Sequence, residues 1–257
     1  MKNSDYHAII LAAGNSERLR ELTKDKPKSF LEINNKKIID YHLDFLSQKG
    51  IEKVTIVVGY LKDLFIKAIG TSYKNIEIDY VISEEYANTG HGWSIFLTRD
   101  VWQKQKKPVI LLHADIFYDL NMLDKVLNSK DENVIIVDNS YDILTGDEVI
   151  VTGKDGIMTG FKWGIKKEDN AAGELIGVNK WSPKFMEQYY KFMDDFFRKN
   201  GKKHNYEPVL DRFIKEKHVN INYINSNGLP WININYKEDY LEAKNKIYPS
   251  IYNKGTK

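Results

Sequence analysis

The residues whose types and spacing most clearly suggest chemistry are two cations near the N-terminus, Arg18 and Lys28. They follow an apolar run at residues 8–11 that gives way to a loop of small residues at 12–14. Small residues let backbone N–H groups approach a phosphate chain closely, because no side chain keeps the ligand away. Arg18 and Lys28 add fixed positive charge at the same place. The combination indicates a binding site for a nucleoside triphosphate.

A carboxylate, Asp115, closely follows the most apolar run of the chain, residues 109–112. An aspartate at the end of a buried strand is well placed to hold Mg²⁺, which takes one or two carboxylates together with phosphate oxygens and water. Aspartates also end strands as ordinary turn residues, and that alternative stays open. Ligands of doubly wound sheets bind beyond the carboxyl ends of the strands, where both Asp115 and the N-terminal loop are expected.

These residues have an order and spacing that resembles the signature of nucleotidyltransferases acting on phosphorylated small molecules: Leu-Ala-Ala-Gly, three residues, Arg-Leu, then Pro-Lys. Many members of that family carry a second glycine where this chain has Ser16. The resemblance implies that Arg18 holds the β- and γ-phosphates and that Lys28 bridges the α-phosphate and the incoming phosphoryl group. It also implies that Mg²⁺ links the triphosphate to Asp115. The nucleotide-binding residues of the loop are then Leu11, Ala12, Ala13 and Gly14.

A polar, glycine-bearing segment at residues 84–95 opens a predicted helix. Such a segment can present backbone groups to a ligand. The resembled family reads the nucleobase in this region. The resemblance therefore implies nucleoside contacts by Asn88, Thr89, Gly90 and Ser94.

The C-terminal segment 231–235 is similar to the closing motif of cytidylyltransferases that act on choline phosphate, phosphonates and inositol phosphate. Those proteins commonly have Trp-x-Glu-Ile-Asp, and the aspartate is their second metal ligand. Here both acids are amides, Asn233 and Asn235. An amide oxygen can coordinate a hard cation but adds no negative charge, so we expect Asn235 to hold the metal less tightly. Either one carboxylate is enough to hold the metal ion, or another acid such as Asp119 is also a ligand, or the activity is weak or absent.

The stretch Gly-Glu-Leu-Ile-Gly at 173–177 resembles an element that faces the acceptor in phosphonate and inositol-phosphate relatives. Its Glu174 is expected to meet a cationic amine. Trp163, Trp181 and Tyr206 are candidates for an aromatic wall, which attracts a quaternary ammonium by cation–π contact. Each of these aromatic residues also fits a place in the hydrophobic core, and both readings stay open.

The composition fits one α/β domain. The chain has 257 residues, of which 42% are hydrophobic, enough for a sizeable core. Its 38 basic and 36 acidic residues are mixed along the sequence, which gives no reason to expect a nucleic acid or a membrane as partner. The absence of cysteine excludes disulfides, thiolate metal sites and cysteine nucleophiles. No apolar run approaches the ~18–20 residues that span a bilayer, and no signal peptide is recognisable, so we expect a cytoplasmic monomer or homodimer.

Strand and helix patterns alternate over the first hundred residues, with strands expected at 7–12, 54–59 and 76–82. This alternation is typical of a parallel sheet covered on both faces. Two runs on either side of a Lys-Asp-Gly turn, the second at 157–165, predict antiparallel strands. We expect a Rossmann-like, doubly wound, mostly parallel mixed sheet with a small antiparallel acceptor-binding subdomain. The expected parts of the single domain are a nucleotide-binding core at about 1–140, an acceptor-binding part at about 141–235, and a C-terminal helix and tail at 236–257.

The resemblance thus implies a cytidylyltransferase that moves CMP from CTP to a small phosphorylated or phosphonate acceptor, similar to phosphocholine or aminoethylphosphonate, and releases pyrophosphate. A sugar-1-phosphate nucleotidyltransferase shares the N-terminal signature. A non-catalytic nucleotide-binding module is consistent with the amide at Asn235. Both alternatives stay open at this point.

Overall fold

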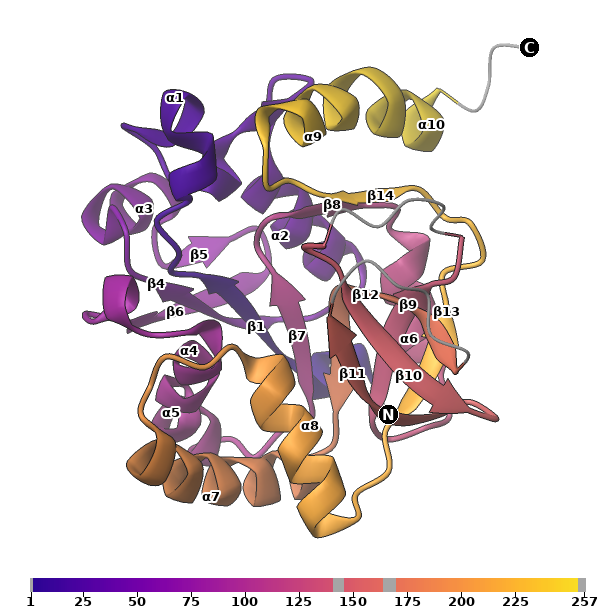
Figure 1. Ribbon diagram of the computed structural model, residues 1–257. Coiled ribbons are helices and arrows are strands. Elements are labelled where there is room, and N and C mark those ends of the chain that lie inside the picture. Colours follow the sequence, from indigo (N-terminus) through magenta and orange to yellow (C-terminus); the bar gives the residue numbers. More distant parts are fainter. Residues whose placement is uncertain (1, 141–145, 164–169, 254–257) are drawn as a thin grey trace.

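A central sheet with helices on both faces organises the molecule (Figure 1). The computed structural model describes residues 2–140, 146–163 and 170–253. Within these residues, ten strands form the main sheet in the order β5-β6-β4-β1-β7-β12-β9-β13-β11-β10. Its parallel half consists of β1 (His7–Ala12), β4 (Lys53–Val58), β6 (Ile76–Ile82) and β7 (Val109–His113), with the short β5 (Ser72–Tyr73) at the edge.

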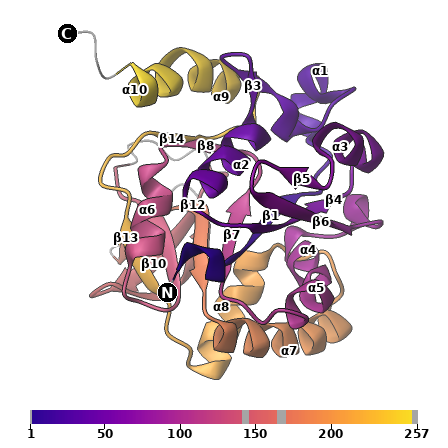
Figure 2. The ribbon, with the colours of Figure 1, turned by 180° about the vertical axis from the view of Figure 1, so that it is seen from behind.

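The parallel strands are buried on both faces, as their continuous apolar runs predict. Successive side chains point to opposite faces, so Ala8 and Ile10 of β1 pack into one core and Ile9 into the other. The first face is covered by α2 (Ile38–Gln48), α3 (Lys62–Ile69) and α6 (Asn121–Asn128), which are seen from behind in Figure 2. The second face is covered by α4 (His91–Leu97), α5 (Arg99–Gln103), α7 (Pro183–Asn200) and α8 (Tyr206–Lys217).

The long strand β12 (Ala171–Trp181) joins the parallel half to a smaller, mainly antiparallel part. Its residues 178–181 pair with β7, and its residues 171–174 pair with β10. The other strands of this part are β9 (Val134–Asp138), β10 (Val149–Lys154), β11 (Ile157–Trp163) and β13 (Asn222–Asn225). Because β10 pairs with both β11 and β12, the pairing closes on itself. The mixed α/β sheet expected from the sequence is confirmed.

The last part of the chain returns to the carboxyl end of β7. Strand β14 (Trp231–Asn233) pairs antiparallel with β8 (Ile116–Tyr118), and the Trp231 indole N–H donates a hydrogen bond of 2.8 Å to Asp138. A helical stretch follows and lies over one end of the molecule, at the top of Figure 1. It consists of α9 (Lys237–Glu242), a π-helical turn at Ala243–Ile247 and α10 (Tyr248–Tyr252).

The remaining elements are short. They are α1 (Arg20–Thr23), the strand pair β2 (Glu32–Ile33) and β3 (Lys36–Lys37), and 3-10 turns at Asn3–Asp5, Glu17–Leu19, Lys28–Phe30 and Tyr86–Asn88. In the turn at 28–30 the Phe30 N–H bonds back to the carbonyl of Pro27, and β2 begins only at Glu32. The strand expected at 157–165 ends at Trp163, and positions 164 and 165 lie outside the described residues.

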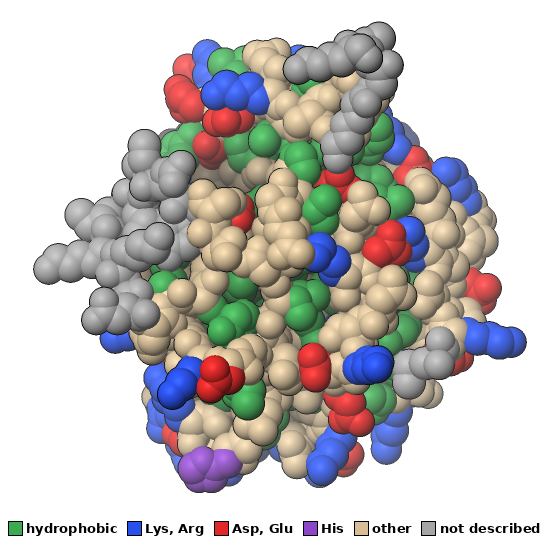
Figure 3. All heavy atoms as spheres, turned by 90° about the vertical axis from the view of Figure 1, so that its right-hand side faces the viewer, with side chains coloured by type: hydrophobic (Ala, Val, Ile, Leu, Met, Phe, Trp, Pro, Cys, Tyr) green, Lys and Arg blue, Asp and Glu red, His purple; other side chains and the backbone are tan. Residues whose placement is uncertain are grey.

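Charged side chains of both signs are spread over the surface. Figure 3 shows this on the face at the right of Figure 1, where acidic and basic residues alternate and neither sign forms a continuous patch. No helix in the described ranges is both long and apolar enough to cross a membrane.

Candidate active site

A cleft opens at the carboxyl ends of β1 and β7, where the sequence places the loop at 11–18 and Asp115. It consists of two adjoining cavities of about 360 and 560 Å³. Residues that line both cavities come from the loop, from the end of β7 and from the C-terminal segment: Leu11, Gly14, Asn15, Glu17, Arg18, Asp115 and Asn235. The two cavities are therefore two ends of one cleft.

The loop after β1 offers backbone to the cleft. No atom lies within 4 Å of the place where a Cβ on Gly14 would stand, so the cleft approaches the main chain there. Ser16 has a φ of +53°, a left-handed conformation that costs a residue with a side chain about 1–2 kcal/mol. Glycine adopts this conformation freely. The backbone thus explains the second glycine of the resembled family at this position.

Lys28 lies between the two oxygens expected to face a metal ion. Its Nζ donates hydrogen bonds to Asp115 Oδ2 at 2.8 Å and to Asn235 Oδ1 at 3.0 Å. The Ile234 N–H bonds to the carbonyl of Asp115 at 2.9 Å, which extends the β14–β8 pairing and places Asn235 beside Asp115. Burial by itself would raise the pKa of Asp115, but the nearby charge and hydrogen bond of Lys28 outweigh it and bring that pKa to about 2.

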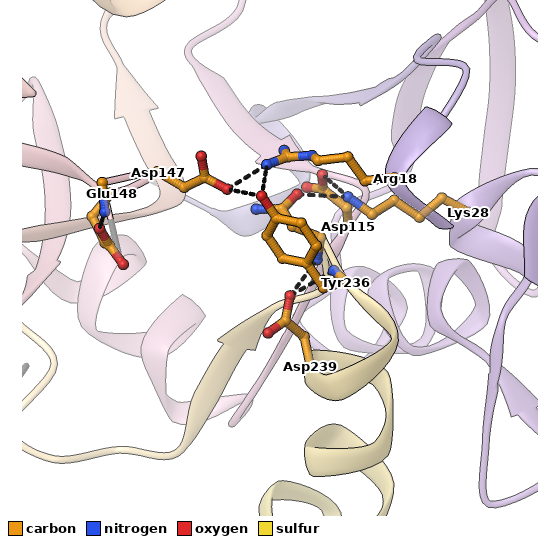
Figure 4. A network of polar contacts seen from close by, with 9 residues as sticks. Arg18, Lys28, Asp115, Asp147, Glu148, Tyr236 and Asp239 are labelled. Carbon is orange, nitrogen blue, oxygen red and sulfur yellow. Dashed lines mark hydrogen bonds and ion pairs between the residues drawn. The ribbon is translucent and has the colours of Figure 1, made fainter. Parts of the chain in front are cut away.

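Arg18 is held at the mouth of the cleft by two residues from distant parts of the chain (Figure 4). Its Nη1 forms an ion pair with Asp147, just before β10, and donates to the Tyr236 hydroxyl at 3.0 Å. That hydroxyl donates to Asp147 Oδ2 at 2.7 Å, and the guanidinium carbon lies 4.9 Å from the centre of the Tyr236 ring. Burial lowers the pKa of Arg18, but these contacts with Tyr236 and Asp147 raise it above its ordinary value. Arg18 is therefore fully charged.

The backbone of the C-terminal segment is fixed by Asp239. Its Oδ2 accepts the N–H groups of Asn235 at 2.8 Å and Tyr236 at 2.7 Å, at the start of α9 (Figure 4). Neighbouring residues of one segment thus contact both cations of the cleft. Sequence reasoning missed Asp147, Tyr236 and Asp239 as members of this site.

The larger cavity includes part of the segment expected to contact the nucleoside. Thr89, Gly90 and Ser94 line it, and Asn88 is not among its lining residues. The Gly90 N–H bonds to the carbonyl of Lys202 at 2.9 Å, and a Cβ on Gly90 would stand 2.2 Å from the carbonyl oxygen of His204. Only glycine permits this close contact between the start of α4 and the loop before α8.

Carboxylates line the far end of the larger cavity, including Glu148, Glu174 and Glu207. Burial raises the pKa of Glu174 to about 8, and the charges of Glu148 and Asp138 add to the shift. Glu207 is buried, which raises its pKa to about 7.

A neutral histidine, His91, lies beside this carboxylate end. Its Nε2 is 3.5 Å from the Glu207 carboxylate, and burial lowers its pKa to about 4. In the described part of the chain, Glu174 has no hydrogen bond or ion pair through its side chain. This end of the cleft can therefore take up a cation.

The aromatic residues expected to face an acceptor lie elsewhere. Tyr206 is 1% exposed, accepts a hydrogen bond from Asn179 at 3.2 Å and packs edge-on against His91. Trp181 is buried against Phe185. Trp163 is half exposed near the end of β11 and is not among the lining residues of either cavity. These three residues do not form the expected aromatic wall, because two of them are needed in the core.

Comparisons with known proteins identify the family of the chain. The family model described as nucleotidyl transferase matches residues 7–148. A CTP:phosphoglutamine cytidylyltransferase from Campylobacter jejuni is 32% identical over 91% of this chain and 97% of its own length. A UTP–glucose-1-phosphate uridylyltransferase from Haloferax volcanii is 27% identical over 93% of this chain and 96% of its own length.

A solved structure gives the same result for the fold. The CTP:phosphocholine cytidylyltransferase of Streptococcus pneumoniae superimposes with a TM-score of 0.72 and 26% identity, covering 93% of this chain and 97% of that one. The family model alone spans more than half of the sequence. The chain belongs to the nucleotidyl transferase family of enzymes.

Proposed function

We propose that this chain is a Mg²⁺-dependent cytidylyltransferase that transfers CMP from CTP to a small phosphorylated or phosphonate acceptor with a cationic group. One observation carries the proposal: a single cleft joins a phosphate-binding end, with Arg18 and Lys28, to an end lined by carboxylates such as Glu174. Asp115 lines both cavities. An acceptor with a phosphate at one end and an ammonium at the other fits this distribution of charge.

The reaction needs little covalent help from the protein. An oxygen of the acceptor's phosphate or phosphonate attacks the α-phosphorus of CTP, and the bond to pyrophosphate breaks as the new bond forms. The task of the protein is to position both substrates and to neutralise the charge that spreads over the phosphates. Lys28 would neutralise the α-phosphate and the incoming group, and Arg18 the β- and γ-phosphates.

The donor atoms at the centre of the cleft fit Mg²⁺. The Asp115 carboxylate and the Asn235 amide oxygen are hard oxygen ligands that both lie within 3.0 Å of Lys28 Nζ. Groups of three or more His, Asp or Glu able to hold a metal are absent from the described residues, so most ligands would come from the nucleotide and water. The ion would neutralise the triphosphate.

The two parts of the chain would divide the substrates between them. Residues up to about 140 would bind the nucleotide, and residues from about 141 to 235, which include Glu174 and Glu207, the acceptor. The segment 236–257 begins with Tyr236, which contacts Arg18, so it also serves the nucleotide end. A cytoplasmic location and a monomeric or dimeric state remain predictions.

The donor and the acceptor are tested together by pyrophosphate release. The purified chain is assayed with each of the four nucleoside triphosphates against phosphocholine, 2-aminoethylphosphonate and glucose 1-phosphate. We expect turnover with CTP and a cationic acceptor. Faster release with UTP or GTP and glucose 1-phosphate would instead support a sugar-1-phosphate nucleotidyltransferase, the second candidate, which the relative from Haloferax volcanii favours. Calorimetric binding of CTP without turnover under any acceptor would support a non-catalytic module.

A further inference from the structure

Asn235 and Tyr236 are consecutive residues that contact the two cations of the cleft, Lys28 and Arg18. The two contacts differ in kind. Lys28 is 13% exposed and lies between two hydrogen-bond acceptors. Arg18 is 48% exposed in the 3-10 turn Glu17–Leu19, and a long exposed side chain has many rotamers unless other groups hold it.

Three contacts hold the Arg18 side chain. The Tyr236 hydroxyl accepts from Nη1 and donates to Asp147, so the three polar groups form a closed set (Figure 4). The Tyr236 ring lies against the guanidinium, which adds a cation–π contact. The backbone of Tyr236 is itself held, because its N–H is bonded to Asp239 at 2.7 Å.

Both polar contacts of the guanidinium with described residues use the same nitrogen, Nη1. A guanidinium has five N–H donors in a rigid, planar fork, and two of its nitrogens can bind two phosphate oxygens side by side. Contacts confined to Nη1 therefore fix the plane of the fork and leave Nε and Nη2 available for a ligand in the cleft.

We propose that Tyr236, held by Asp147 and Asp239, is a positioning residue that orients Arg18 for the β- and γ-phosphates of the nucleotide. The inference rests on the proposed function, since it takes Arg18 to be a phosphate-binding residue. The hydroxyl of Tyr236 supplies the orientation and the ring supplies the surface on which the guanidinium rests.

The test compares Tyr236→Phe with Tyr240→Phe. The control removes a hydroxyl from α9, the helix that follows Tyr236, where Tyr240 donates a hydrogen bond to the carbonyl of Glu32. Dissociation constants of CTP, pyrophosphate and CMP are measured by calorimetry with Mg²⁺ present. We expect Tyr236→Phe to weaken the binding of CTP and pyrophosphate at least about tenfold, the lower limit for one hydrogen bond to a charged group, and to leave the binding of CMP unchanged. Tyr240→Phe should change none of the three.

A double-mutant cycle separates positioning from general damage to the fold. In an Arg18→Ala background, Tyr236→Phe should have no further effect on CTP affinity, because the group through which Tyr236 acts is gone. An equal effect in both backgrounds, or an equal loss for CMP and CTP, would overturn the proposal. Tighter CTP binding by Asp147→Asn would also overturn it, since the contact would then hold Arg18 away from the phosphates. A wild-type chain that binds no nucleoside triphosphate would refute the proposed function itself, whereas normal wild-type binding with an unaffected Tyr236→Phe refutes only this inference.

Discussion

The Nζ of Lys28 and the Oδ1 of Asn235 are joined by a 3.0 Å hydrogen bond across 207 positions of sequence. The same ammonium group bonds to Asp115 at 2.8 Å. One cation therefore bridges the N-terminal signature, the end of β7 and the C-terminal segment. The contact explains how an amide fits where the resembled cytidylyltransferases have an aspartate, because a neutral oxygen still accepts a hydrogen bond from the lysine.

Replacing Asn235 with aspartate adds a second carboxylate beside Lys28 and Asp115. We expect the concentration of Mg²⁺ needed for half-maximal turnover to fall about tenfold, because a charged oxygen binds a hard cation more tightly than an amide oxygen. A metal titration of pyrophosphate release at fixed CTP measures the effect. Asn227→Asp, in an exposed turn, is the matched control. An unchanged midpoint would mean that position 235 does not face the ion.

Removing the Asp115 carboxylate should abolish most of the activity. In Asp115→Ala we expect the turnover number to fall at least about 100-fold, since the central carboxylate of the cleft is lost while the side chains of Arg18 and Lys28 remain. Initial rates of pyrophosphate release measure the loss. The control, Asp124→Asn, removes a carboxylate that pairs with Lys49 outside the cleft, and it should keep wild-type rates. Activity in Asp115→Ala close to wild type would remove Asp115 from the mechanism.

The raised pKa of Glu174, about 8, predicts a pH-dependent affinity for a cationic acceptor. The carboxyl is mostly protonated at pH 7, half ionised at pH 8 and mostly ionised at pH 9, so binding should strengthen about tenfold between pH 7 and pH 9 and then level off. Phosphocholine is the suitable acceptor, because its quaternary ammonium does not titrate. The KM for phosphocholine, measured from pH 7 to 9, should follow this curve in the wild type and lose it in Glu174→Gln. An identical curve in both proteins would assign the titration to another group.

The same shift makes a prediction about stability. The pKa of Glu174 is higher in the folded chain than its ordinary value of 4.5, so the folded state binds the proton more tightly than the unfolded state. The free energy of unfolding should therefore decrease as the pH rises from about 4.5 to about 8. Glu174→Gln lacks this contribution, and its melting temperature should exceed that of the wild type at pH 8 but not at pH 4.5. A melting temperature difference that is the same at both pH values would contradict this.

Two glycines of the cleft should respond differently to alanine. A Cβ at position 90 would stand 2.2 Å from the His204 carbonyl oxygen, whereas one at position 14 meets nothing within 4 Å. We expect Gly90→Ala to destabilise the fold by about 2 kcal/mol or more, a decrease in melting temperature of about 4–8 °C for a chain of this size. Gly14→Ala should melt like the wild type. Thermal unfolding, monitored by circular dichroism, measures both melting temperatures. Equal melting temperatures for the two variants would contradict the close contact at Gly90.

The features predictable from sequence were those encoded by local spacing. The apolar runs of β1 and β7 and the small loop residues after β1 placed Arg18, Lys28 and Asp115 near one another, because carboxyl ends of parallel strands meet at one edge of a sheet. The glycine-bearing segment before α4 lies at the same cleft because it follows the carboxyl end of the parallel strand β6.

The remaining partners depend on pairings between distant segments. Tyr236 reaches Arg18 only because β14 pairs with β8, and Asp147 only because β10 folds beside β12. No spacing rule connects these residues in the sequence. Glu207 is buried beside His91, because α8 packs against α4. Tyr206 could not be assigned from the sequence, because an aromatic residue of the core and one that lines a binding site have the same sequence pattern. The structure places it in the core.

Strand β12 has a mechanical consequence for how the enzyme can move. Its one end is bonded to β7, which leads to Asp115, and its other end carries Glu174 and is bonded to β10. A regular strand rises ~3.3 Å per residue, but the register of β12 shifts between Leu175 and Asn179, where Gly177 has a φ of +85°. Moving the parallel half of the sheet away from the antiparallel part would require breaking the main-chain hydrogen bonds that join β12 to β7 or to β10. The separation between Asp115 and Glu174 is therefore set by the main-chain bonds of a single strand.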